Sequence, residues 1–181
     1  MAKKNPKRRG SRAYLADFQK TASGTYVYTG ATYVYAKNAD RSRRRTLQLL
    51  WLWCAVLVAG VLVPGCVPAG GMLNCAYVIL PFSGELICAV CTVWAVVRLS
   101  VNRDPLREYV YRATVEALPR RAVATAIFAA AACVGEIVFV LLHTPGSVIG
   151  WLLAAWMAIT AAASLLLRRT IRAAKWNKIK Q

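Results

Sequence analysis

The sequence has few acidic residues and almost no histidine. Its 181 residues include 7 Asp and Glu against 24 Lys and Arg, and a single His. With so few Asp, Glu and His residues, the chain has few side chains suited to acid–base catalysis. The phosphate loop Gly-x-x-x-x-Gly-Lys and the hydrolase motifs His-Glu-x-x-His and Gly-x-Ser-x-Gly are missing, which argues against an ATPase and against common metallo- and serine hydrolases. We therefore expect a protein that is not an enzyme and needs no cofactor.

Apolar residues are abundant, at 58% of the chain. They form four runs, at about 46–63, 76–99, 122–142 and 148–167. As a helix, each run is long enough to cross a hydrocarbon core of roughly 30 Å. None of them alternates apolar and polar residues as a barrel strand does. The sequence thus predicts an all-α integral membrane protein, a four-transmembrane-helix bundle surrounded by the lipid bilayer.

The basic residues are confined to three segments. Residues 1–45 hold 12 Lys and Arg, residues 98–121 hold 6 and residues 168–181 hold 6, whereas 64–75 and 143–147 hold none. Basic loops stay on the cytoplasmic side of a membrane. We therefore expect both termini and the 100–121 loop in the cytoplasm, in the plasma membrane of a bacterium. Topology explains the charge, so we expect attraction to anionic lipids and no nucleic-acid partner.

The chain divides into a basic cytoplasmic arm (1–45), a membrane domain (46–167) and a basic cytoplasmic tail (168–181). Within the arm, two Tyr-Val-Tyr triplets flank residues 29–32 and predict a β-hairpin over 24–36. A lone hairpin needs a surface to lie on, either its own helices, the membrane or another protein. A third triplet follows in the 100–121 loop. The tyrosines are candidates for docking a partner: Tyr26, Tyr28, Tyr33, Tyr35, Tyr109 and Tyr111.

Two short amphipathic helices are expected at the inner surface of the membrane. Asp104 as N-cap and Pro105 at the first helical position predict a helix over 105–118. A strand that pairs with the hairpin is the alternative there. After Leu167, basic residues alternate with Ile and Trp, which predicts that the tail continues as an interfacial helix.

Two cysteines, Cys66 and Cys75, lie in the first outer loop, on the oxidising side of the membrane in this topology. A disulfide between them would link the first two membrane helices. The alternative is a pair of free thiols.

Two acidic residues, Glu85 and Glu136, fall inside the apolar runs. Charges there are costly, so both are expected to face the bundle interior and are candidates for function. At about 1.5 Å per residue, they lie roughly 13 and 9 Å from the outer boundary, at similar depth. Further polar candidates share their helix faces: Cys88, Thr92, Thr125, Cys133 and His143.

Three interpretations of these residues are open. The two carboxyls could share a proton or bind a cation along a transport path. Glu, Cys and His could gather a metal such as zinc, although no known metal motif is matched. The carboxyls could also be neutral and hydrogen-bonded, and serve only helix packing or a partner contact.

The sequence favours a non-enzymatic accessory or scaffold subunit that docks a partner or anionic lipid through its basic, aromatic cytoplasmic face. The alternative is a proton- or cation-linked transporter or channel subunit that uses Glu85 and Glu136. Helices 1–2 and 3–4 do not resemble each other, so the chain is not an inverted-repeat transporter. A path would need a homo-oligomer or a second membrane protein.

Overall fold

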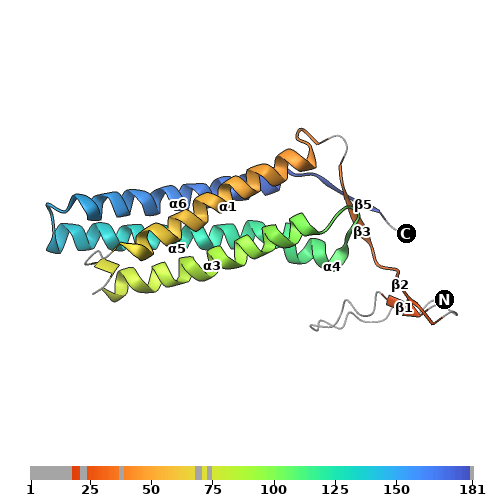
Figure 1. Cartoon of the computed structure of the whole chain (residues 1–181), viewed down its shortest axis with the longest axis horizontal. Coiled ribbons are helices and arrows are strands. Elements are labelled where there is room, and N and C mark those ends of the chain that lie inside the picture. The colour runs from red at the N-terminus through yellow and green to blue at the C-terminus, as the bar shows by residue number, and fades with distance from the viewer. Residues whose placement is uncertain (1–17, 21–23, 37–38, 68–70, 73–74, 180–181) are drawn as a thin grey trace, which may run out of the picture.

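The structure, a computed structural model, describes residues 18–20, 24–36, 39–67, 71–72 and 75–179. Residues 1–17 of the predicted basic arm lie outside this part of the chain. Four long helices run side by side along the long axis of the molecule (Figure 1). They are α1 (Arg43–Cys66), α3 (Ala76–Val101), α5 (Leu118–His143) and α6 (Val148–Ala173). All four are long and apolar enough to cross a membrane, which confirms the four predicted spans.

Local signals explain where these helices begin. Ser42 Oγ accepts a hydrogen bond from the Arg45 N–H (3.4 Å), and Ser147 Oγ accepts one from Gly150 N–H (3.2 Å). Both serines are N-caps, which satisfy backbone donors that the first turn leaves free. Pro119 lies in the first turn of α5, where its missing N–H costs nothing.

The helices approach one another closely where glycine faces a neighbour. A Cβ at Gly60 of α1 would overlap the Thr160 side chain of α6. A Cβ at Gly135 of α5 would lie 2.8 Å from the Tyr77 carbonyl oxygen of α3. In lipid, where burying apolar surface gives little advantage, such close packing holds helices together.

The outward faces of the helices are apolar. Large aliphatic side chains on all four helices are more than half exposed, among them Leu62, Leu80, Ile127 and Leu152. An apolar surface spread over a whole bundle is rare in water and suits contact with acyl chains.

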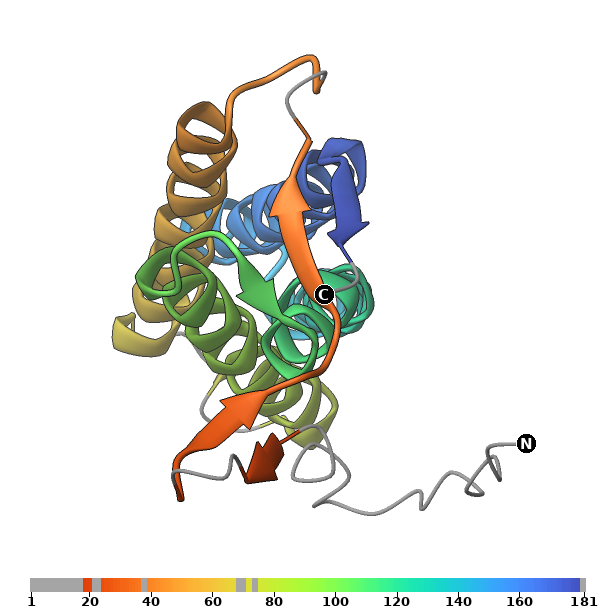
Figure 2. The same cartoon turned by 90° about the vertical axis from the view of Figure 1, so that its right-hand side faces the viewer.

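A small sheet covers one end of the bundle (Figure 2). Its central strand is β3 (Thr32–Tyr35), which pairs antiparallel with β4 (Leu106–Arg107) and with β5 (Trp176–Ile179). The short helix α4 (Glu108–Tyr111) follows β4 directly. We call β3, β4, α4 and β5 the cap. A separate two-stranded sheet joins β1 (Phe18–Lys20) to β2 (Tyr26–Tyr28).

The predicted hairpin over 24–36 is wrong in its pairing. Its two triplets form β2 and β3, but β2 pairs with β1, and β3 pairs with β4 and β5. The segment between them is tied to the cap, since the Glu108 N–H donates to Ala31 O (3.1 Å). An isolated hairpin is barely stable in water, whereas β3 gains two partner strands and packs against helix ends.

The predicted helix over 105–118 is only partly correct. The segment begins as strand β4, turns helical at Glu108, and continues through the π-helical turn η2 (Arg112–Glu116) to Leu118, where α5 begins. Asp104 does not cap a helix; its carboxylate lies 3.6 Å from the Arg43 guanidinium. The alternative of a strand is right in kind, but the strand precedes the third Tyr-Val-Tyr triplet.

The predicted interfacial helix of the tail is also replaced by a strand. Helix α6 extends to Ala173, and Trp176–Ile179 then pairs with β3 as β5. The edge of β3 presents backbone donors and acceptors, and the tail pairs with them as a strand. If the tail formed an amphipathic helix on the membrane surface, these groups of β3 would stay unpaired.

Cys66 and Cys75 are free thiols in the structure, and a disulfide between them stays a prediction. Cys66 ends α1 with an exposed side chain. Cys75 precedes α3, where its N–H donates to Gly71 O (3.2 Å) and its carbonyl accepts from Val78 N–H (3.0 Å).

One cluster of buried apolar side chains connects the cap to the helix ends. It includes Leu106 of β4 and Val110 of α4, together with residues of all four long helices such as Leu50, Leu99 and Leu167. For Leu106 and Val110, which lie in the cap outside the four long helices, burial away from water contributes about 1.5–3 kcal/mol each. The cap is therefore an integral part of the bundle's packing.

The Gly60–Thr160 crossing can be tested by adding one methyl group. We expect Gly60→Ala to destabilise the protein by about 1–3 kcal/mol, because overpacking forces neighbours to shift. Thermal unfolding in mild detergent measures this. Gly146→Ala is the control, since a Cβ there meets nothing within 4 Å. Equal stability of the Gly60→Ala protein and the wild type would show that α1 and α6 do not cross as described.

Candidate functional site

Glu85 is the most unusual residue of the membrane segment. Its side chain is fully buried in α3, on the same face as Ala89 and Thr92. Neither carboxyl oxygen has a hydrogen-bond partner in the described structure. Buried polar groups are nearly always hydrogen-bonded, and each exception calls for a physical explanation. Glu85 is thus the strongest candidate for a role beyond packing.

Glu136 occupies a second buried position, on α5. It is 1% exposed, and its Oε2 atom lacks a hydrogen-bond partner within the described residues. Gly71 makes room for the carboxyl, since a Cβ there would overlap Oε2, whereas a Cβ at Gly150 would lie 3.7 Å from Oε1, an ordinary contact distance. Nothing in the local sequence pattern links Gly71 to α5, so its contact with Glu136 could not be predicted.

The two carboxyls do not form a hydrogen-bonded pair. Both oxygens of Glu85 are without a partner, so no hydrogen bond joins Glu85 to Glu136. A proton shared directly between them is therefore not the arrangement found. The hydrogen bond between the two carboxyls that would neutralise them mutually is likewise absent among the described residues.

The other polar candidates of the membrane segment are used within the bundle. Thr92 and Thr125 are buried and donate to the carbonyls of Cys88 (2.8 Å) and Arg121 (3.0 Å), one turn earlier on their own helices. The Cys133 thiol donates to Ala154 O of α6 (3.2 Å). These bonds satisfy Thr92 and Thr125 within their own helices and link Cys133 of α5 to α6.

His143 lies apart from these buried groups. It is exposed at the end of α5, and its ring stacks on Phe139 with centroids 4.9 Å apart. Across the described residues, no three His, Cys, Asp or Glu side chains gather closely enough to hold a metal ion. The zinc interpretation therefore has no geometry to support it.

The candidate tyrosines mostly build the cap. Tyr33 stacks on Tyr111, with ring centroids 3.9 Å apart and planes 3° from parallel. The Trp176 ring meets Tyr111 and Tyr35 edge-on, at 6.0 and 5.1 Å. Tyr35 also donates from its hydroxyl to Arg41 O (3.0 Å). These rings connect β3, α4 and β5, so their surfaces are largely occupied.

The remaining tyrosines differ in exposure. The Tyr28 hydroxyl donates to Ala31 O (3.3 Å) and accepts from the Glu108 N–H (3.1 Å). The Tyr109 ring lies under the Arg98 guanidinium, 5.9 Å from centroid to Cζ. Tyr26 is 69% exposed. Of the six predicted docking tyrosines, Tyr26 alone keeps most of its surface open.

The surface of the cap end is basic. The arginines of the long helices all lie at this end: in the first turns of α1 and α5 and the last turns of α3 and α6. Within the described chain, only Arg43 and Arg112 form ion pairs, with Asp104 and Glu108. Most arginines at the cap end therefore have no acidic partner among the described residues.

Comparison with known protein families, with curated proteins and with solved structures finds no match to this chain. Function is therefore inferred from residues and geometry. Two features stand out, the buried unpaired carboxyls and the basic cap end.

The stacking of Tyr33 on Tyr111 should couple the two residues energetically. In a double-mutant cycle with Tyr33→Leu and Tyr111→Leu, we expect a coupling of about 0.5–1.5 kcal/mol beyond the loss of buried area. Chemical unfolding in mild detergent gives the four stabilities required. The matched cycle with Tyr26→Leu and Tyr111→Leu should show no coupling, because Tyr26 is exposed. Additive effects at Tyr33 and Tyr111 would mean that the rings do not stack.

Proposed function

We propose that the protein is a non-enzymatic accessory or scaffold subunit of a cell membrane, and that its basic cap end docks an anionic partner surface. In this proposal both termini and the segment between α3 and α5 are cytoplasmic. The single observation that carries it is the gathering of the cations of four helices at one end. The opposite connections contain no Lys or Arg, which supports that orientation by the positive-inside rule.

The occupation of the tyrosines supports docking by charge. Four of the six tyrosine rings are tied to the cap through stacking or hydroxyl contacts. The side chains that remain for contact with a partner at this end are therefore mainly the cationic ones. Arg169, Arg172 and Lys175 are exposed beside the cap. Each basic residue near an anionic surface contributes about 1 kcal/mol of attraction. The combined effect suits an acidic protein face or an anionic leaflet.

The proposal is tested by neutralising these three cations together. We expect Arg169→Gln, Arg172→Gln and Lys175→Gln in one protein to weaken docking by on the order of a hundredfold. The measurement is tagged purification from native membranes in mild detergent, with mass spectrometry of retained proteins and lipids. The matched control exchanges the same residues between Arg and Lys and should retain its ligands. Equal retention in the neutralised protein would contradict docking at this end.

A second function, proton- or cation-linked transport, is favoured by one specific observation. Glu85 is fully buried, and neither carboxyl oxygen is paired. A carboxyl kept in a membrane segment without a structural partner is typical of proton and ion paths. Glu136 lies on the neighbouring α5 and has an unpaired oxygen of its own. The path would be completed by another copy of the chain or by a partner.

Transport predicts that Glu85→Gln abolishes proton- or cation-driven flux in proteoliposomes, because the amide cannot release a proton or carry charge. Thermal unfolding should be unchanged or raised, since the amide is cheaper to bury than a carboxylate. Glu116→Gln is the control, because Glu116 is exposed and lies in η2. Flux that survives Glu85→Gln at the wild-type rate would remove this function.

A further inference from the structure

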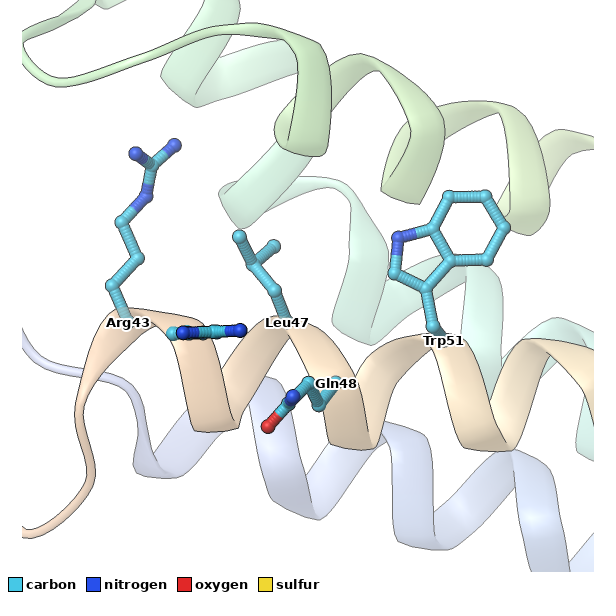
Figure 3. A pocket seen from close by; sticks show the side chains of 5 residues that line it. Arg43, Leu47, Gln48 and Trp51 are labelled. Carbon is cyan, nitrogen blue, oxygen red and sulfur yellow. The ribbon is translucent and has the colours of Figure 1, made fainter.

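A groove of about 550 Å³ opens along the first turns of α1 (Figure 3). Arg43, Arg44, Leu47, Gln48 and Trp51 line it. The two arginines lie at its outer end, and Leu47 and Trp51 lie further along the helix. Spacings of three and four residues place these side chains on adjoining faces of α1. The groove therefore changes from cationic to apolar along its length.

The wall of the groove is held in place by the end of α3. The Trp51 indole N–H donates to Ser100 Oγ (3.0 Å). The Arg43 guanidinium donates to Leu99 O (3.4 Å) and lies 3.6 Å from the Asp104 carboxylate. In Figure 3 both side chains reach from α1 toward α3. These contacts fix the wall before any ligand binds, which lowers the entropy cost of binding.

Two polar side chains in the groove are open to a ligand. Arg44 and Gln48 are exposed, and neither side chain forms a hydrogen bond or ion pair within the described part of the chain. A guanidinium presents a planar fork of N–H donors that matches phosphate oxygens. The Gln48 amide, one turn along, adds donors and an acceptor suited to an ester or hydroxyl.

The position of the groove selects an amphiphilic ligand. Arg43 and Arg44 precede the apolar run that begins near residue 46, and Trp51 lies within it. From Arg43 to Trp51 the helix rises by about 12 Å, roughly the depth from headgroup phosphate to upper acyl chain. A free anion would satisfy only the arginine end. An apolar molecule would satisfy only the other.

We propose that this groove binds one anionic phospholipid, with its phosphate at Arg44 and Gln48 and its acyl chains along Leu47 and Trp51. The proposal rests on the proposed function in one respect, since it needs the basic end to face an anionic leaflet. It adds a defined site to that general attraction.

The experiment compares two neighbouring arginines. The purified full chain in mild detergent is titrated with phosphatidylglycerol or phosphatidylcholine, and bound lipid is counted by native mass spectrometry. We expect the wild type to bind one phosphatidylglycerol in preference to phosphatidylcholine. Arg44→Gln should lower that affinity about fivefold. Arg45→Gln, with the same loss of charge on the next residue but outside the groove, should keep the affinity within about twofold.

Three outcomes would overturn the site. Equal losses in Arg44→Gln and Arg45→Gln would indicate diffuse surface charge. Displacement of the lipid by millimolar inorganic phosphate would indicate a site for the free oxyanion. Unchanged lipid binding in both Arg44→Gln and Gln48→Leu would exclude the groove. In that last case, the proposed function stands without this site if the triple substitution of Arg169, Arg172 and Lys175 still abolishes docking. If the triple substitution also leaves docking intact, both the lipid site and the proposed function are removed.

Discussion

The structure depends on the backbone pairing of β3. This four-residue strand lies between β4, from the segment joining α3 to α5, and β5, from the end of the chain. The Thr32 hydroxyl and the Ile179 carbonyl that accepts from it are 147 residues apart in sequence. This pairing draws the start of α1, the start of α5 and the end of α6 to one place. The basic helix ends and the aromatic rings meet there as a consequence.

The bundle itself follows a different constraint. Lipid supplies no hydrogen-bond partners for the backbone, so helices satisfy their own. Glycine and small polar side chains then allow close crossings, and threonine hydroxyls bond within their own helices. The unpaired carboxyl oxygens of Glu85 and Glu136 are an exception, because burying a polar group without a hydrogen bond costs free energy. This cost is the physical reason for linking the two glutamates to function and not to packing.

The helix bundle could be predicted from the sequence much better than the strands of the cap end. The four spans could be read from hydropathy, because length and composition alone decide whether a helix can cross a bilayer. The helices proved longer at the basic end, where Arg168 and Arg169 belong to α6, because long cationic stems can lie along apolar surface while their heads stay in water. The hairpin could not be read correctly. Alternating Tyr and Val predict a strand, but they do not say which strand it joins.

The sequence by itself determined the number of helices long and apolar enough to cross a membrane, the burial of both glutamates and the confinement of basic residues to certain helix ends. These properties depend on local composition and on the cost of placing charge in hydrocarbon. Only the tertiary structure decided that β3 joins β4 and β5, that Gly71 faces the Glu136 carboxyl, and that Arg43 and Trp51 bond to the end of α3. These contacts join residues far apart in the chain. Such residues compete with many alternative partners, and the choice among them is made by the packing of the whole molecule.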